Sequence, residues 1–145
     1  MSDGLAIRIA GQDDARRIGE LDRKWTPIFD RAGRFRRAAS KGRLLVAEVD
    51  GELVGYAAQG RFFGYDFLEL LAVRPDKRRQ GIATALIRAV EARSASGKLF
   101  TSTNRSNTPM RGLCQRLGFQ RSGVVENLDN DDPELIYYKR VEAGR

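Results

Sequence analysis

Histidine is absent from this chain of 145 residues, and cysteine occurs once, as Cys114. Without histidine the chain lacks the commonest metal ligand, and one cysteine cannot form an internal disulfide. No apolar run approaches the roughly 20 residues of a membrane span, and the first residues lack the layout of a signal peptide. We therefore expect a cytoplasmic protein in a reducing setting, with no metal centre and no membrane partner.

Acidic residues are fewer than basic ones: 19 aspartates and glutamates face 26 lysines and arginines, a net charge of +7. This balance favours a polyanionic partner, but the positive charge is scattered rather than gathered in one arm. The densest cluster, Arg74 to Arg79, falls at a turn between a predicted strand and a predicted helix. The sequence thus argues against nucleic acid, which needs clustered basic residues with aromatic or helical readout.

The pattern of apolar residues predicts one domain over residues 1–145, built from strands and helices around one sheet. The chain shows no internal repeat and no linker. Asp50-Gly51 predicts a tight hairpin turn, and the residues from Gly60 to Tyr65 are expected to form a glycine- and aromatic-rich loop. The predicted strands are 5–9, 44–49, 53–58, 67–73, 99–103, 119–125 and 135–141, and the predicted helices are 13–24, 31–39, 81–96 and 107–117. The element order is β-α-α-β-β-β-α-β-α-β-β, a mixed α/β arrangement.

The stretch from Val73 to Leu86 organises the chain. An apolar strand ends at Val73, cations precede Gly81, and a helical pattern begins there. The first N–H groups of a helix have no intrahelical partner and carry a partial positive charge, so such a turn suits a polyanion. A glycine at its centre would let the backbone approach a phosphate closely.

Arg78-Arg79-Gln80-Gly81-Ile82-Ala83 resembles the acyl-CoA-binding motif of the GNAT family of N-acetyltransferases, Arg/Gln-x-x-Gly-x-Gly/Ala. A second stretch, from Asn107 to Phe119, is similar to the family's segment ending in Leu-Gly-Phe. The element order is also that of the GNAT fold, in which one mixed, mostly antiparallel sheet is flanked by helices. The resemblance therefore covers nearly the whole chain.

This resemblance implies that the chain holds acetyl-CoA. The pyrophosphate would lie against the N–H groups of Arg79 through Thr84, with Arg78 and Arg79 as ion-pair partners. Solvated turn arginines are the alternative for those two side chains. The cofactor-binding residues that the resemblance implies are Leu71, Ala72, Val73, Arg78, Arg79, Gln80, Gly81, Ile82, Ala83, Thr84 and Asn107. Leu71 to Val73 would pair with pantetheine, and a backbone N–H near residue 71 would polarise the thioester carbonyl.

Two residues are candidates for proton transfer. Glu69 stands alone among apolar residues of a predicted buried strand, where burial would raise its pKa toward that of a general base; a structural ion pair with an arginine is the alternative. Cys114 falls where the family has a tyrosine that protonates the leaving thiolate. A thiol can donate a proton, but it also packs well as a small apolar residue. Solvent or Tyr138 would serve otherwise.

The acceptor is less well defined by the sequence. Residues 126–134 form an acidic loop, which in relatives borders the acceptor site and here would attract a cationic amine, either a small molecule or a lysine side chain. A solvated acidic loop is the alternative. Ser102 replaces a glutamate that acts as base in some relatives, and Asn107 would cap its helix, bond pantetheine, or both. The aromatic residues Trp25, Phe29, Phe62, Phe63 and Tyr65 would line the same cleft or pack elsewhere.

Two functions follow from these features. The first is an acetyl-CoA-dependent N-acetyltransferase in which a primary amine attacks the thioester directly, without an acyl-enzyme. The second is a non-catalytic acyl-CoA-binding sensor or regulatory domain, which the missing tyrosine keeps open. Nucleotide binding at the same turn is disfavoured, because the phosphate-binding motifs of nucleotide-binding proteins are absent. The resemblance also allows a homodimer through the last strands.

Overall fold

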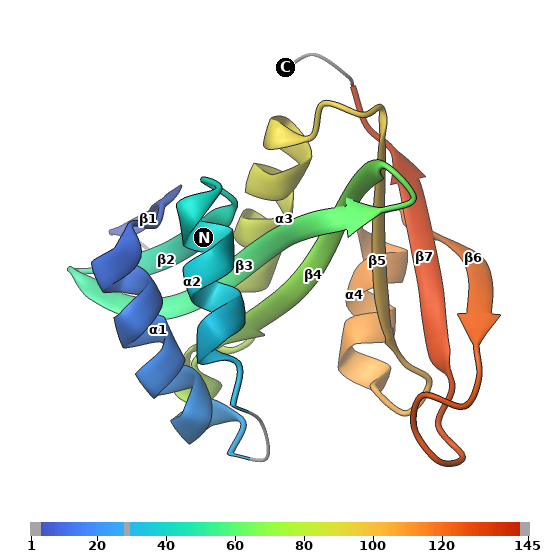
Figure 1. The fold of residues 1–145 in the computed structure, drawn as a ribbon, viewed down its shortest axis with the longest axis horizontal. Helices are drawn as coiled ribbons and strands as arrows, with labels where there is room; N and C mark the ends of the chain where they lie inside the picture. The colour runs from blue at the N-terminus through green and yellow to red at the C-terminus, as the bar shows by residue number, and fades with distance from the viewer. Residues whose placement is uncertain (1–3, 28–29, 143–145) are drawn as a thin grey trace. The chain divides into compact units, whose positions relative to one another are not determined.

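The computed structural model describes residues 4–27 and 30–142. Along the chain the elements are β1 (Leu5–Ile9), α1 (Gln12–Trp25), α2 (Ala32–Ser40), β2 (Leu44–Val49), β3 (Glu52–Phe62), β4 (Tyr65–Val73), the 3-10 turn η1 (Pro75–Lys77), α3 (Ile82–Arg93), β5 (Lys98–Asn104), α4 (Thr108–Arg116), β6 (Gln120–Val125) and β7 (Glu134–Arg140). The predicted element order is confirmed, with η1 added between β4 and α3 (Figure 1). Among the described residues, no helix is long and apolar enough to cross a membrane.

One open sheet contains all the strands, in the order β1-β2-β3-β4-β5-β7-β6. The pairs β1–β2, β2–β3, β5–β7 and β6–β7 are antiparallel, whereas β4 and β5 run parallel. The parallel ladder joins Asp66–Leu68 of β4 to Leu99–Thr101 of β5. The predicted mixed, mostly antiparallel sheet is confirmed.

The predicted loop from Gly60 to Tyr65 is wrong. Strand β3 continues to Phe62, β4 begins at Tyr65, and only Phe63 and Gly64 connect them. Both connecting residues have positive φ, 51° and 83°, as a two-residue hairpin turn requires. The prediction fails because glycines beside these aromatic residues are typical of loop composition, whereas the aromatic residues Phe62 and Tyr65 lie at the ends of the two strands.

Contacts between Cα atoms divide the chain into two compact units. The first holds Met1–Gly60 with Leu70–Val90, and the second holds Arg61–Glu69 with Glu91–Arg145. Strand β4 contributes residues to both. The predicted single domain over 1–145 stays a prediction.

In the first unit, helices cover both faces of the strands. Val46 and Tyr56 are register partners, and they lie in one apolar cluster with Ile18 of α1 and Phe35 of α2. Their neighbours Ala47 and Gly55 point the other way, since side chains alternate along a strand. A Cβ atom on Gly55 would lie 3.3 Å from Leu86 of α3, so α3 covers that second face (Figure 1).

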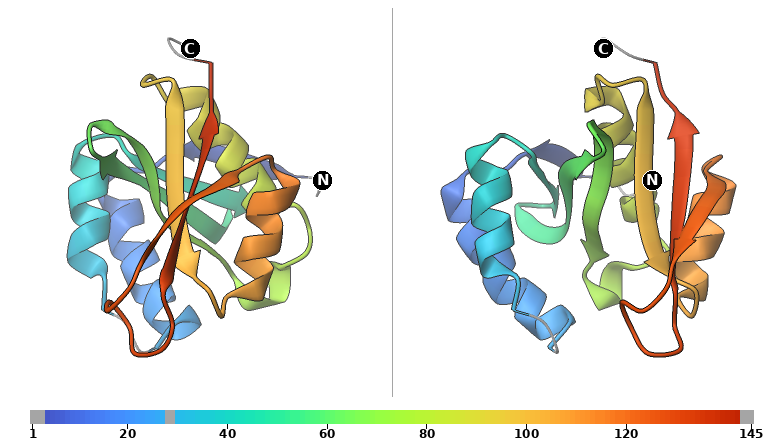
Figure 2. Two further views of the ribbon diagram at one scale, coloured as in Figure 1. Left: turned by 90° about the vertical axis from the view of Figure 1, so that its right-hand side faces the viewer. Right: turned by 45° about the vertical axis from the view of Figure 1, so that its right-hand side comes forward.

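In the second unit, β5 alternates strictly between the two faces of the sheet. Leu99, Thr101 and Thr103 are buried. Leu99 pairs with Lys139 of β7, whose Nζ atom donates to the Leu117 carbonyl oxygen at 2.7 Å and to Glu91 Oε2 at 3.0 Å. The ends of α3 and α4 therefore lie on this face of β5 and β7 (Figure 2).

Buried Asp66 joins β4 to the segment after α3. Its Oδ2 atom accepts hydrogen bonds from the backbone N–H groups of Ala95 and Ser96, at 3.0 and 3.1 Å, and from Ser96 Oγ at 2.7 Å. Asp66 is only 3% exposed. Since a buried carboxylate must be satisfied by donors, Asp66 holds the segment after α3 against β4 within the second unit.

Candidate active site

The turn between β4 and α3 belongs to the first unit and has an unusual backbone. Arg79 and Gly81 both have positive φ, 65° and 80°. Helix α3 begins at Ile82, and the Gly81 carbonyl oxygen accepts the N–H of Ala85 at 3.0 Å. A Cβ atom on Gly81 would meet nothing within 4 Å. The turn thus leaves the N-terminal end of α3 open to a ligand, as an anion site requires.

The arginines of this turn have different environments. Arg74 Nε donates to Asp76 at 2.7 Å and Arg74 Nη1 to Glu52 at 3.2 Å, and these hydrogen bonds raise the pKa of Arg74. Arg78 Nε donates to the Val73 carbonyl oxygen at 3.3 Å. Arg79 is exposed and makes no hydrogen bond or ion pair within the part of the chain that the structure describes. Of these three, Arg79 is the side chain best placed to meet an external anion.

The end of β4 that leads to this turn lies unusually close to β3. A Cβ atom on Gly55 would stand 2.9 Å from the carbonyl oxygen of Ala72. Only a glycine allows this approach, because real Cβ contacts with backbone atoms are longer. Leu71 and Ala72 are half-buried and Val73 is buried. Gly55 was not among the sequence candidates, although a glycine inside a strand pattern is a known sign of close backbone approach.

We expect Gly55→Ala to destabilise the protein by about 1 to 3 kcal/mol, because the added methyl group forces β3 and β4 apart. Thermal unfolding measures the change, and a fall in the melting temperature of roughly 3 to 10 °C corresponds to that range. Gly123→Ala is the matched control, since Gly123 is also a strand glycine and has nothing within 4 Å of a built Cβ. Equal melting temperatures for the two variants would contradict the close approach.

Glu69 belongs to the second unit and is exposed. The expectation that Glu69 is a buried carboxylate is wrong. Burial alternates along this part of β4, so that Asp66 and Leu68 are buried and Glu69 is exposed. The face of β4 that carries Glu69 is therefore not covered as both faces of a central strand would be. The argument from burial to a general base therefore fails. A role for Glu69 has to rest on its position in the strand.

Cys114 is fully buried in α4, also in the second unit. Burial raises the pKa of its thiol to about 11. An ordinary thiol has a pKa of about 8.5, so proton transfer from Cys114 to a thiolate of that kind would be unfavourable by roughly two pKa units. This favours the packing role over the proton donor.

Asn107 caps α4, as the sequence predicts. Its Oδ1 atom accepts the N–H of Met110 at 3.2 Å. Pro109 follows within the first turn, where a missing N–H costs nothing. The Nδ2 group of Asn107 has no partner among the described residues. The capping role and a second hydrogen bond to a ligand are thus compatible.

Some carboxylates of the acidic loop at residues 126–134 accept hydrogen bonds from neighbouring residues of the protein. Asn104 Nδ2 donates to Asp129 Oδ2 at 2.8 Å, and Ser106 donates to Asp132 through N at 3.0 Å and Oγ at 2.6 Å. The hydrogen bonds from Ser106 lower the pKa of Asp132. Two of the loop acids therefore hold the loop against residues 104–106, so only some of its charge faces an approaching cation.

The candidate aromatic residues fall into two separate groups. In the first unit, Trp25 stacks on Tyr56 with ring centroids 6.4 Å apart. In the second unit, Phe62 contacts Phe63, Phe67 and Phe100 at 4.8, 5.4 and 5.1 Å, and Tyr65 contacts Phe100 at 5.9 Å. Phe29 lies outside the described residues. The expectation of one shared aromatic lining is not supported for Trp25, which packs beside the first unit's core.

Comparison with known proteins decides the family. The model of the acetyltransferase (GNAT) family matches residues 11–119. The chain belongs to the GNAT acetyltransferase family. As a GNAT protein it is an acyltransferase, and acetyl-CoA is the donor that this family uses.

Individual GNAT relatives agree with this assignment. A Bacillus subtilis protein named as a candidate ribosomal protein bS18-alanine N-acetyltransferase is 33% identical over 104 residues, which cover 67% of this chain and 68% of the relative. An N-alpha-acetyltransferase of Sulfurisphaera tokodaii is 31% identical over 109 residues, covering 63% of this chain and 65% of the relative. The crystal structure of a GNAT acetyltransferase from Bacillus cereus has 34% identity and a TM-score of 0.89, covering 95% of this chain and 98% of that one.

Proposed function

We propose that the protein transfers an acetyl group from acetyl-CoA to a primary amine. The observation that carries this proposal is the turn from Arg79 to Gly81, which opens the N-terminal end of α3 in a chain of the GNAT family. Two relatives bear names of N-acetyltransferases, one for an alanine of ribosomal protein bS18 and one an N-alpha-acetyltransferase. The acceptor is a primary amine of a small molecule or of a polypeptide.

In this proposal the first unit holds the coenzyme. The pyrophosphate lies against the N–H groups of residues 79–84, where helix dipole and unpaired donors favour an anion, and Arg79 adds a cation. Leu71 to Val73 offer backbone groups to the pantetheine arm, and the N–H near Leu71 polarises the thioester carbonyl. The amide of Asn107 stays a predicted further donor to the coenzyme.

The acetyl transfer needs a neutral amine. Glu69 accepts the proton of the ammonium group, the amine nitrogen forms a bond to the acetyl carbon, and the carbon–sulfur bond breaks. The second proton on nitrogen is lost as the thiolate gains one, so that an amide and a free thiol result. Because the Cys114 thiol is buried with a raised pKa, the proton for the thiolate comes from solvent or from Tyr138.

Release of free thiol from acetyl-CoA, followed across a panel of primary amines, tests this function. Turnover that saturates with one class of amine is the expected result. Binding of acetyl-CoA without thiol release on any amine would replace the enzyme by the sensor or regulatory domain. Competition with ATP distinguishes the enzyme and the sensor from a nucleotide-binding protein. Only a nucleotide-binding protein would release bound coenzyme A when ATP is added.

Glu69→Gln and Cys114→Ala should differ in activity. We expect Glu69→Gln to lower kcat/KM by about 100-fold, within the range for loss of a general base, with acetyl-CoA binding retained. Cys114→Ala should keep kcat within about threefold while lowering the melting temperature, because it removes buried volume only. Steady-state kinetics and thermal unfolding measure the two effects. A large loss of kcat in Cys114→Ala, or none in Glu69→Gln, would reverse the assignments.

A further inference from the structure

One face of the sheet in the second unit carries a row of aromatic rings with carboxylates at one end. Phe67 of β4 pairs with Phe100 of β5, and Phe100 pairs with Tyr138 of β7. The rings of Phe100 and Tyr138 lie 5.8 Å apart, and Phe62 packs against both Phe67 and Phe100. Since Lys139 faces α4, these alternate residues line the opposite face. The aromatic side chains of this row are only half-buried.

Charge changes sign along this face. The register places Lys98 beside Arg140, then Phe100 beside Tyr138, then Ser102 beside Ile136, and finally Asn104 beside Glu134. Lys98 Nζ lies 5.0 Å from the ring of Tyr65. The face therefore has cations at one end, aromatic rings in the middle and a carboxylate at the other end. A bound cation would be repelled from the first end and attracted to the last.

Ser102 fixes the carboxylate of Glu134. Ser102 Oγ donates to Glu134 Oε2 at 2.7 Å, and both side chains are half-buried. The register partner of Glu134 is Asn104, so the contact with Ser102 is diagonal across β5 and β7. It directs the carboxylate toward Phe100 and Tyr138. Glu69 follows two residues after Phe67 and shares the same face by alternation. The carboxylate of Glu134 thus lies on the sheet face, whereas the carboxylates of Asp129 and Asp132 hold the loop itself.

The spacing on this face defines a ligand. Ser102 and Phe100 are two residues apart on β5, so their Cα atoms are about 7 Å apart. The carboxylate that Ser102 contacts and the ring of Phe100 are thus close enough for one small ligand to contact both. Apolar rings favour an aromatic partner through stacking, and a half-buried carboxylate favours an ammonium group through charge-assisted hydrogen bonds.

We propose that Glu134, oriented by Ser102, binds the ammonium group of an acceptor whose aromatic ring packs on Phe100 and Tyr138. The acceptor is a primary amine joined to an aromatic ring by a short alkyl linker, as in a free arylalkylamine or in a polypeptide with an N-terminal aromatic residue. This inference rests on the proposed function for its biological meaning and narrows the acceptor class. Glu134 is a specificity-determining residue in it, and Glu69 keeps the proton-accepting role.

Equilibrium binding tests the inference without turnover. Calorimetric titration of the full chain uses phenethylamine, n-butylamine, which lacks the ring, and 2-phenylethanol, which lacks the ammonium group. We expect phenethylamine to bind at least about tenfold more tightly than either, because each comparator loses one of the two interactions. A short peptide with N-terminal phenylalanine, measured beside phenethylamine, distinguishes a polypeptide acceptor from a free amine. Equal affinities for phenethylamine and n-butylamine would overturn the inference.

Glu134→Gln isolates the carboxylate. The glutamine amide oxygen still accepts the hydrogen bond of Ser102, so the fold is retained while the charge is lost. We expect about tenfold weaker binding of phenethylamine and no change for 2-phenylethanol. Glu126→Gln is the control, because Glu126 is an exposed acid at the end of β6 with the same change of charge. Unchanged phenethylamine affinity in Glu134→Gln would also overturn the inference.

Thiol release separates this inference from the proposed function. If the wild-type protein binds phenethylamine as expected but releases no thiol from acetyl-CoA, the acetyltransferase function fails and the binding site stands. If thiol is released with n-butylamine as efficiently as with phenethylamine, the function stands and the aromatic specificity fails. With the expected specificity, Glu134→Gln raises the KM for phenethylamine by about tenfold and leaves kcat within about threefold, since uniform binding is lost.

Discussion

Replacing Asp22 by alanine is expected to lower the free energy of unfolding by about 3 to 5 kcal/mol. Removing one member of a buried ion pair leaves the other charge uncompensated, which costs that much. Such a loss is a large part of the stability of a typical domain, roughly 5 to 15 kcal/mol. In thermal unfolding it corresponds to a fall of about 10 to 15 °C.

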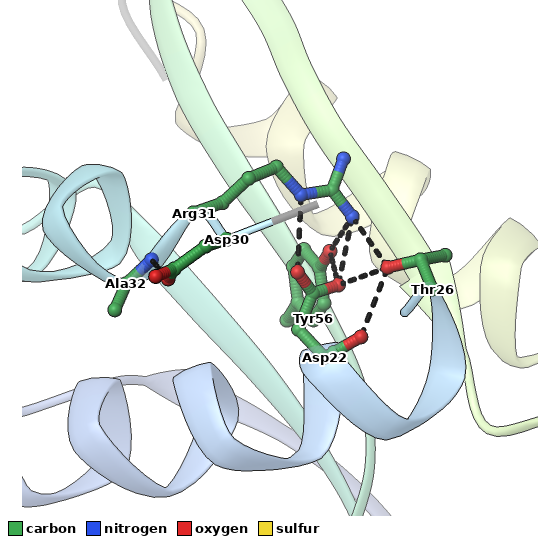
Figure 3. A network of polar contacts seen from close by, with 6 residues as sticks. All are labelled: Asp22, Thr26, Asp30, Arg31, Ala32 and Tyr56. Atoms are coloured by element: carbon green, nitrogen blue, oxygen red, sulfur yellow. Dashed lines mark hydrogen bonds and ion pairs between the residues drawn. The ribbon is translucent and has the colours of Figure 1, made fainter. Parts of the chain in front are cut away.

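Asp22 has this effect because Arg31, Tyr56 and Thr26 all donate to its carboxylate (Figure 3). It is fully buried in α1. Arg31 makes a two-point contact, with Nε 3.0 Å from Oδ2 and Nη2 2.7 Å from Oδ1. The Tyr56 hydroxyl donates to Oδ1 at 2.6 Å, and Thr26 Oγ1 lies 3.2 Å from the same atom. The network joins α1, the start of α2 and β3.

The pH dependence of this network has a defined sign. Burial alone would raise the pKa of Asp22, but hydrogen bonds from Arg31 and Tyr56 outweigh burial and lower it below its ordinary value. A carboxyl with a lowered folded-state pKa stabilises the protein above its unfolded pKa of about 3.9. That contribution is lost as the pH falls through the folded-state pKa. Asp22→Asn should therefore be least different from the wild type in strong acid and most different at neutral pH.

Glu20→Gln is the control for Asp22. Glu20 lies on the same helix and pairs with Arg16 at 3.6 Å, with both side chains more than half exposed. Exposed pairs contribute about 0 to 1 kcal/mol. Chemical denaturation at pH 7 and at about pH 3 measures both variants. Equal losses for Asp22→Ala and Glu20→Gln would rule out the buried network as a major source of stability.

Gly81→Glu is expected to abolish the stabilisation of the protein by acetyl-CoA. In the wild type, ligand at 100 times its dissociation constant adds about 2.7 kcal/mol to the free energy of unfolding, a rise of roughly 8 to 10 °C in melting temperature. The new carboxylate would stand at the open N-terminal end of α3, where the pyrophosphate is proposed to bind. It repels the anion and fills the approach.

Backbone strain has to be separated from this effect. Gly81 has a φ of +80°, so any side chain there adds about 1 to 2 kcal/mol of strain. Gly51→Glu carries the same strain, since Gly51 has a φ of +83°, and a Cβ there also meets nothing within 4 Å. Gly51 lies in the hairpin between β2 and β3. Both variants should start from lowered melting temperatures, but only Gly51→Glu should rise with acetyl-CoA. If acetyl-CoA raised the melting temperature of Gly81→Glu as much as that of the wild type, the proposed pyrophosphate site at this turn would be wrong.

Sequence patterns located most elements because their signals are local. The alternation of Leu5 to Ile9, the Asp50-Gly51 turn and the Asn107 cap each depend on neighbouring residues, and the structure places β1, a tight hairpin and the start of α4 there. The loop predicted around Phe62 is wrong for the same reason, because that prediction also used only neighbouring residues. Its composition favours a loop, whereas cross-strand ring contacts with Phe67 and Phe100 keep it in β3. Those partners are distant in sequence or on another strand.

Burial was the least predictable property of the site residues. Asp22 is spaced from Ala15 and Ile18 so that it lies on the buried face of α1, a sign that the sequence carries. Glu69 is surrounded by apolar neighbours yet exposed, because one side of a strand can be open while the other is covered. For Glu69 no local pattern shows this exposure, since it depends on which other elements cover each position of the strand.

The sequence by itself determined the family motif, the order of elements and the position of the glycine turn, because these depend on spacing along the chain. Only the tertiary structure decided that Gly55 must lack a side chain, that Asp22 is enclosed by Arg31, Thr26 and Tyr56, and that Ser102 holds Glu134 beside the aromatic row. Each of these depends on atoms from strands or helices far apart in the chain. Their distances follow from sheet register and packing, which single-residue patterns do not encode.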